Sequence, residues 1–188
     1  MNEDPFKKQE QLAVRIEIAT PEDWEAYKEI RLLAITGKDA NMFEVSQDPQ
    51  KLESEIKRID QEWKDLLDKN DSFVVLAWRD SQVIGMGVVS KKEKYWSLGG
   101  GYVREGFREE NNGKKIFAKR LQVIRGMGGI KARTGMDKGN SRSIGIATFF
   151  GFKQTTEDLD EEDDFEMELK NVNDPEVIKK IKEVLGEK

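Results

Sequence analysis

The chain has 188 residues, a formal net charge of −5, and equal shares, 37% each, of apolar and charged residues. This length and balance fit a single domain of mixed helix and strand, and the acidic charge argues against a general nucleic-acid-binding surface. The sequence has no histidine and no cysteine, which excludes disulfides, thiolate catalysis, Cys/His zinc sites and Ser-His-Asp triads. Any catalysis would use carboxylates, tyrosine, lysine, backbone groups or water, and we expect no metal.

The N-terminus predicts neither secretion nor membrane insertion. Residues 1–12 form a charged, polar tail without the apolar core of a signal peptide. No later stretch is apolar over the length that crosses a bilayer. We therefore expect a cytoplasmic protein without membrane or nucleic-acid partners.

The first half of the chain predicts one strand, two helices and a hairpin. Alternating apolar residues predict a strand over residues 14–18, and Thr20 followed by a proline predicts the start of a helix. A second helix is expected over residues 49–67, where apolar residues recur at helical spacing. Two strands, over residues 73–78 and 83–89, are separated by a tight turn and form the hairpin.

The second half predicts strands that alternate with helices. Strands are expected over residues 96–103, 130–136, 151–156 and 165–169, and helices over 113–127 and 141–150. A last amphipathic helix lies within residues 171–188, after a domain of residues 13–170. This order predicts an α/β (α+β) fold, with a mixed, mostly antiparallel sheet and helices on both of its faces.

A segment rich in polar and small residues lies where the strand over residues 96–103 ends and the next helix begins. Arg108 can reach an anion, and the backbone amides of residues 109–114 can hold phosphates at the positive end of the helix. Gly113 has no side chain and lets a ligand approach closely. The same pattern also fits an ordinary strand-to-helix turn.

This segment resembles the cofactor-binding signature of the GNAT N-acetyltransferase family, Val-x-Pro-x-x-[Arg/Gln]-x-x-Gly-x-[Gly/Ala]. Val103, Arg108 and Gly113 match the signature, whereas Glu105 replaces its proline and Asn111 replaces its first glycine. Asparagine is the residue other than glycine that best tolerates a left-handed backbone, so the second replacement is mild.

A second block resembles the family's Asn-x-x-Ala-x-x-x-Tyr-x-x-x-Gly-Phe. Asn140, Gly151 and Phe152 match it, whereas Ser143 replaces the alanine and Ala147 replaces the tyrosine. The resemblance covers the whole predicted domain, including its first two helices.

The resemblance implies the GNAT fold, in which the fourth and fifth strands splay apart and the pantetheine arm of acetyl-CoA lies in the gap. Three consecutive glycines, residues 99–101, suit a bulged strand beside such a gap, although a weak, kinked strand would have the same sequence. Asn140 would contact the pantetheine or simply cap its helix. The implied cofactor contacts are Gly101, Val103, Arg108, Glu109, Glu110, Asn111, Asn112, Gly113, Lys114, Asn140 and Ser143.

The reaction that the resemblance implies is direct attack of a primary amine, of a small molecule or a peptide, on the thioester of acetyl-CoA. A backbone N–H near Val103 could polarise the thioester carbonyl. The family's usual proton donor to the departing thiolate is missing at Ala147, and Tyr102 is a candidate substitute, although strand alternation can point it away. Glu44 and Glu105 are candidate general bases, or else solvated surface carboxylates.

Several alternatives remain open. The acidic run over residues 157–164 could attract a polyamine, an aminoglycoside or a lysine side chain, or be a solvated loop. The last helix could pack on the domain or form a homodimer contact. The function has two principal hypotheses, an active N-acetyltransferase and a non-catalytic acyl-CoA-binding or interaction module on the same fold. Loss of CoA binding at the altered loop is a third.

Overall fold

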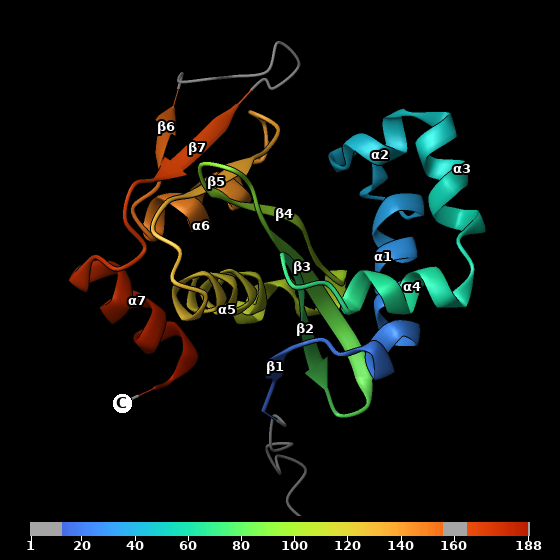
Figure 1. Cartoon of the computed structure of the whole chain (residues 1–188), viewed down its shortest axis with the longest axis horizontal. Coiled ribbons are helices and arrows are strands. Elements are labelled where there is room, and N and C mark those ends of the chain that lie inside the picture. Colours follow the sequence, from blue (N-terminus) through green and yellow to red (C-terminus); the bar gives the residue numbers. More distant parts are fainter. Residues whose placement is uncertain (1–12, 156–164, 188) are drawn as a thin grey trace, which may run out of the picture.

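The computed structural model describes residues 13–155 and 165–187, and within them seven strands form one sheet (Figure 1). Neighbouring strands are antiparallel except β4 and β5, which are parallel, and their order is β1-β2-β3-β4-β5-β7-β6. The predicted mixed, mostly antiparallel sheet is confirmed. Its strands are β1 (Arg15–Ile18), β2 (Ser72–Arg79), β3 (Gln82–Lys91), β4 (Trp96–Val103), β5 (Ala132–Gly135), β6 (Lys153–Thr155) and β7 (Glu166–Leu169).

Helices cover both faces of this sheet. Figure 1 shows α1 to α4 grouped on one side and α5, α6 and α7 on the other. The helices are α1 (Trp24–Thr36), α2 (Glu44–Gln47), α3 (Pro49–Lys57), α4 (Asp60–Leu67), α5 (Asn112–Gly126), α6 (Ser141–Phe149) and α7 (Pro175–Leu185). Short 3₁₀ turns are η1 (Pro21–Asp23), η2 (Ala40–Met42) and η3 (Glu105–Glu110).

Each face has its own hydrophobic core because side chains alternate along the strands. Val75 and Ala77 of β2 point into a core with α5, α6 and α7. Val74 and Leu76 of the same strand point into a second core with α1 and α4. The expected α/β architecture, with helices on both faces, is confirmed.

Strand β4 contains a bulge at its glycines. Met86 of β3 pairs with Tyr102 and Val88 pairs with Gly99, so two residues of β4 lie opposite one residue of β3. Gly100 has a φ of +58°, the left-handed conformation that glycine adopts in such bulges. The bulge changes which face each side chain meets: Leu98 packs in the α5 core, whereas Tyr102 packs on the α1 side. The prediction of a bulged strand is confirmed.

Strands β4 and β5 separate soon after they meet. They pair only at Trp96 with Ala132 and at Ser97 with Arg133. Beyond this point a side-chain bond remains, in which Thr134 Oγ1 donates to the carbonyl of Leu98 at 2.9 Å. The rest of β4 therefore has an edge that β5 does not cover, and the expected splay of the fourth and fifth strands is confirmed.

The prediction of one helix over residues 49–67 is wrong. The chain leaves the helical conformation at Arg58 and Ile59, whose ψ angles are 128° and 161°, and this break separates α3 from α4. The periodicity was misleading because it placed Ile56 and Ile59 in the core, whereas they are 48% and 62% exposed. Trp63 of α4 is fully buried, so the break turns the second helix onto the sheet.

The predicted helix start at Thr20 is confirmed, and α7 also begins at a capping residue. The amide of Thr20 donates to Asp23 Oδ2 at 2.9 Å, as in a capping box. Asp174 caps the amide of Glu176 at 2.9 Å at the start of α7. The buried side chain of Ile181 then joins α7 to the α5 core.

Other predictions differ in extent or are not covered. Strand β5 is shorter than the predicted residues 130–136, and Ile130 is 61% exposed. The N-terminal tail and the acidic run over residues 157–164 lie outside the described residues. Within residues 13–155 and 165–187, no helix is both long and apolar enough to cross a membrane.

Candidate functional site

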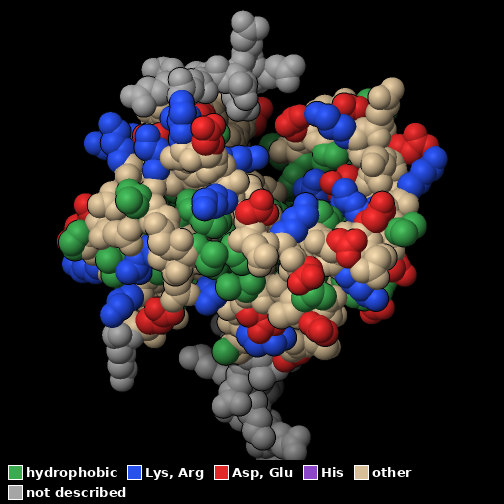
Figure 2. All heavy atoms as spheres, viewed as in Figure 1, with side chains coloured by type: hydrophobic (Ala, Val, Ile, Leu, Met, Phe, Trp, Pro, Cys, Tyr) green, Lys and Arg blue, Asp and Glu red, His purple; other side chains and the backbone are tan. Residues whose placement is uncertain are grey.

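A cavity of about 670 Å³ lies in the gap between β4 and β5. Its walls are the uncovered half of β4, the end of β5, the starts of α5 and α6, and the segment between α1 and α2. Figure 2 shows the surface hollowed between the α2 side of the molecule and the β5 end of the sheet. The cavity thus connects the helices of one face with those of the other.

One end of the cavity is the N-terminus of α5. Asn111 precedes the helix with φ 59° and ψ 17°, so the left-handed conformation expected for this asparagine is confirmed. The first intrahelical bond is that of the Lys115 amide to the Asn111 carbonyl, at 3.0 Å. The amides of Asn112, Gly113 and Lys114 come before it, and no side chain caps this end. Such a helix start binds anions well.

The side chain of Asn112 holds the loop together and does not point at a ligand. It is fully buried, and its Nδ2 donates to the carbonyl of Phe107 at 2.9 Å and to Glu110 Oε2 at 3.4 Å. Glu110 in turn pairs with Arg79, and this hydrogen bond lowers the pKa of the Glu110 carboxyl. Of the predicted contacts at these two residues, only backbone amides remain available for a phosphate.

Arg108 lines the cavity, but its charge is already compensated. Its Nε donates to the carbonyl of Val103 at 2.8 Å, and its guanidinium forms an ion pair with Asp39. The hydrogen bond with Asp39 raises the pKa of the arginine further. The guanidinium also lies over the ring of Tyr102, 5.7 Å from its centre. Arg108 therefore fastens η3 to β4 and to the segment after α1, whereas the amides at the start of α5 have no such partner.

The start of α6 forms another wall. Asn140 Oδ1 accepts from the amide of Ser143 at 3.0 Å, so this asparagine caps the helix, and both residues line the cavity. Gly113 faces Ile146 of α6, since a Cβ at this position would lie 3.4 Å from Ile146 Cδ1.

The rim carries further charged side chains. Glu109 and Arg142 form an exposed ion pair of 2.9 Å between η3 and α6, and both line the cavity. Lys114 also lines it, with its Nζ 4.2 Å from the centre of the Phe149 ring. Gly101 and Val103 contribute the wall of β4. The predicted cofactor residues thus surround one cavity, apart from Glu110 and Asn112, which support it from behind.

The three candidate catalytic residues have different positions. Tyr102 lines the cavity on the α1 side, with its ring 6.3 Å from that of Phe43. Glu44 and Glu105 do not line it: both side chains are exposed and are paired with Lys51 and Lys38, respectively. The structure therefore brings together Tyr102 and the cofactor residues, and leaves both carboxylates outside.

Ala147 is fully buried in the α5 core, where its carbonyl accepts from the amide of Phe152 at 3.1 Å. The family's usual tyrosine hydroxyl therefore has no counterpart on α6. Of the tyrosines that the structure describes, Tyr102 is the one that lines the cavity.

The sequence analysis did not identify four charged residues that line the cavity: Asp39, Arg120, Asp137 and Arg142. Asp39 and Arg142 gave no signal, because their roles depend on partners distant in the sequence. Arg120 was detectable: it interrupts the apolar face of α5 between Phe117 and Leu121, both of which are buried. A charged residue at such a position needs a structural or functional reason.

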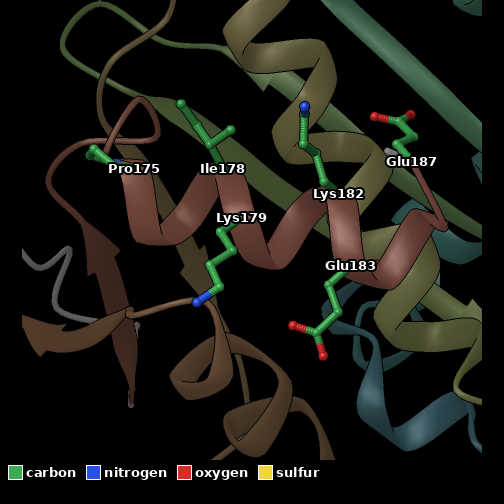
Figure 3. Close-up of a pocket in the computed structure, with 6 residues that line it drawn as sticks. All are labelled: Pro175, Ile178, Lys179, Lys182, Glu183 and Glu187. Carbon is green, nitrogen blue, oxygen red and sulfur yellow. The ribbon is translucent and has the colours of Figure 1, made fainter.

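A second, shallow groove lies on the outer face of α7 (Figure 3). It is lined by Pro175, Ile178, Lys179, Lys182, Glu183 and Glu187. All of these residues belong to α7 except Glu187, which lies two residues after its end, and none of them lines the cavity between β4 and β5. The groove brings together no side chains from other elements.

Comparisons with known proteins agree with this architecture. A PaiA N-acetyltransferase from Thermoplasma acidophilum, solved with coenzyme A, has a TM-score of 0.67 and 20% identity, covering 85% of this chain and 99% of that one. YncA from Salmonella typhimurium, solved with its cofactor acetyl-CoA, has a TM-score of 0.63 and 15% identity, covering 84% and 94%. A ribosomal-protein-alanine N-acetyltransferase from Brucella melitensis has a TM-score of 0.62 and 20% identity, covering 82% and 98%.

The sequence has no match among curated proteins. The model of the acetyltransferase (GNAT) family matches residues 38–152, which is more than half of the 188 residues and includes β4, η3, α5 and α6. The chain therefore belongs to the GNAT acetyltransferase family.

Proposed function

We propose that this protein is an N-acetyltransferase that moves the acetyl group of acetyl-CoA to a primary amine of a small molecule or a peptide. The observation that carries the proposal is the continuous cavity that runs from the uncapped start of α5 along the free edge of β4. A phosphate-bearing, extended thioester fits this shape, with an anion site at one end and unpaired strand backbone beside its arm.

The donor and the acceptor would approach from opposite faces of the sheet. The α5 amides and the Asn140 cap lie on the α5 side, where the CoA moiety would bind. Met42, Phe43 and Tyr102 line the other side of the cavity, next to the segment between α1 and α2. The amine acceptor would therefore meet the thioester at the bulge of β4.

The proposed step is direct aminolysis. The amine nitrogen, after losing a proton to solvent or to a protein base, forms a bond to the carbonyl carbon of the thioester. The carbon–sulfur bond breaks, its electron pair leaves with the sulfur of CoA, and the thiolate takes a proton. Tyr102 is the hydroxyl we propose for that proton transfer, with water as the alternative donor. Backbone N–H groups at the bulge would stabilise the oxyanion.

A thermal-shift titration with CoA and acetyl-CoA tests the binding part of this proposal. Ligand at a hundred times its Kd should stabilise the fold by about 2.7 kcal/mol. A variant at the α7 groove, Lys179→Ala, is a suitable control because Lys179 is exposed and does not line the cavity. An unchanged unfolding temperature at saturating CoA would refute the proposal.

A non-catalytic acyl-CoA-binding module is the second candidate, and the buried Ala147 in place of the family's tyrosine favours it. A panel of amines, with thiol release from acetyl-CoA as the readout, separates the two. Turnover that falls in Tyr102→Phe, at unchanged affinity for CoA, supports the enzyme. Tight CoA binding without turnover on any amine supports the module.

A further inference from the structure

Arg120 is a buried cation that has no counter-ion among the residues that the structure describes. It lies in the middle of α5, is 5% exposed, and lines the cavity between β4 and β5. Its Nη1 donates to the carbonyls of Val88 and Gly99, at 3.3 and 3.1 Å. Among the residues that the structure describes, no carboxylate pairs with it. Burial lowers its pKa to about 10, so it still carries its charge at neutral pH.

Part of the guanidinium has no partner within the described residues. Its Nε is buried and makes no hydrogen bond, and the two recorded bonds both use Nη1. Burying a charge costs free energy unless hydrogen bonds and an opposite charge compensate it. The two backbone carbonyls and the ring of Phe117, 5.0 Å from the guanidinium carbon, supply only part of that compensation, because none of them carries an opposite charge.

The glycines of β4 keep the space in front of Arg120 open. A Cβ at Gly101 would lie 3.5 Å from Arg120 Nη2, and a Cβ at Gly99 would have no heavy atom within 4 Å. On the other side, Gly87 makes room for the arginine, since a Cβ there would lie 2.8 Å from its Nε. A group that enters the cavity at the bulge can therefore reach Nη2, which takes part in neither of the two hydrogen bonds to carbonyls.

The position of Arg120 indicates which substrate it serves. It lies on the same helix as the amides of the proposed phosphate site, eight residues from the start at Asn112, or about 12 Å at a helical rise of about 1.5 Å per residue. The acceptor side of the cavity, with Phe43 and Tyr102, belongs to the opposite face of the sheet. An anion that pairs with Arg120 would therefore be part of the donor, at the acyl end of the thioester.

We propose that Arg120 binds a carboxylate carried by the acyl group, so that the preferred donor is the CoA thioester of a short dicarboxylic acid. This inference rests on the proposed function and changes only the acyl group that is transferred. The bond changes stay those of aminolysis, and the carboxylate is unchanged by the reaction. Arginine is suited to this role because its planar guanidinium binds carboxylates through paired hydrogen bonds.

Isothermal titration calorimetry, which measures the affinity of the full chain for CoA, butyryl-CoA and succinyl-CoA, tests the inference. Butyryl-CoA matches the chain length of succinyl-CoA but lacks the charge. One charge-assisted hydrogen bond corresponds to roughly a tenfold or greater difference in affinity, so succinyl-CoA should bind at least about tenfold more tightly than butyryl-CoA. Arg120→Met should abolish that preference and leave the affinity for CoA within about threefold.

Two further variants separate recognition from folding. Lys119→Met makes the same charge change on the same helix outside the cavity, and should keep the preference for succinyl-CoA. Gly101→Ala leaves Arg120 in place but adds a methyl group against its Nη2. It should weaken the binding of succinyl-CoA more than the binding of CoA. This variant decides the question if Arg120→Met does not fold.

The outcomes are distinguishable. If CoA itself does not bind, the proposed function fails. If CoA binds but the wild type holds butyryl-CoA as tightly as succinyl-CoA, the inference about Arg120 is overturned while the proposed function stands. Equal losses of affinity for all three ligands in Arg120→Met and in Gly101→Ala would also overturn the inference, because Arg120 would then only anchor the bulge of β4.

Discussion

The loop around Arg108 and the middle of α5 around Arg120 border the same cavity, but the partly buried Arg108 and the buried Arg120 have different partners. Arg108 has a carboxylate partner, a carbonyl partner and an aromatic ring against it. Arg120 has two carbonyls and the ring of Phe117, whose centre is 5.0 Å from its guanidinium carbon, but within the described part of the chain it has no carboxylate. The family signature includes Arg108, yet that charge is used to hold the loop. The arginine that is left for a ligand lies outside the signature, so a motif match and an available charge are separate observations.

Gly87→Ala should give the largest effect on stability, because it tests how tightly Arg120 is held. The new methyl group would lie 2.8 Å from Arg120 Nε and 2.9 Å from Ile116 Cγ2. Overpacking of this kind costs about 3 kcal/mol at the upper end of its usual range. Urea unfolding measures it, with Gly99→Ala as the matched control because a Cβ there has no neighbour within 4 Å. Equal losses in the two variants would show that the space around Arg120 is not restricted.

Asp39→Ala should lower the free energy of unfolding by about 2 kcal/mol, since it leaves the partly buried guanidinium of Arg108 without its counter-charge. A double-mutant cycle with Arg108→Met isolates the pair, and the double variant should lose less than the sum of the single losses. Asp39→Ala should also tighten CoA binding at low salt, because Arg108 becomes free to face the phosphates. Additive losses in the cycle would mean that the ion pair does not hold the loop.

Acidification should lower the stability of the fold, because carboxylates that pair with arginines become protonated. The hydrogen bond from Arg79 lowers the pKa of Glu110 from its ordinary value of 4.5. At Glu168, burial raises the pKa, but the hydrogen bond from Arg133 and the neighbouring positive charges lower it by more. A carboxyl whose folded pKa is depressed contributes stability above its unfolded pKa and loses it as the pH falls through the folded value. The free energy of unfolding should therefore be flat near neutrality and fall below about pH 4.5.

Replacing Glu110 by glutamine tests the sign of this effect. Glu110→Gln should flatten the acid limb of the stability profile, whereas Arg120→Met should leave its shape unchanged because no described carboxylate pairs with Arg120. An acid limb that is steeper in Glu110→Gln would contradict this assignment.

Arg120→Met should change stability least, by less than about 1 kcal/mol in either direction. The variant loses two hydrogen bonds to carbonyls but also removes an uncompensated buried charge, and a hydrophobic residue of similar length fills the space. Chemical denaturation of both arginine variants makes the comparison direct. A loss in Arg120→Met that exceeds the loss in Arg108→Met would mean that Arg120 is chiefly a structural residue.

The sequence predicted the order of the elements and the bulge because these depend on local signals, whereas the splay of β4 and β5 was expected from the resemblance to the family. Three consecutive glycines, an asparagine before α5 and period-two alternation each act within a few residues. The break between α3 and α4 was missed because Ile56 and Ile59 continue the helical period while facing solvent.

The electrostatics of the site could not be predicted in the same way. The pairing of Arg108 with Asp39 joins positions 69 residues apart, and no periodicity specifies it. Glu44 and Glu105 were proposed as bases from their positions in the chain, yet their side chains are exposed and do not line the cavity. Whether a charge is compensated depends on which distant residues the fold brings beside it.

An amide NMR titration with CoA tests the location of the donor site most directly. We expect the largest shifts at the amides of Asn112, Gly113 and Lys114, together with the free edge of β4 from Leu98 to Val103. Lys179 on α7 serves as an internal reference, because it lies in the separate groove and should not shift. Shifts that concentrate on α7, or that spare the start of α5, would contradict the placement of CoA between β4 and β5.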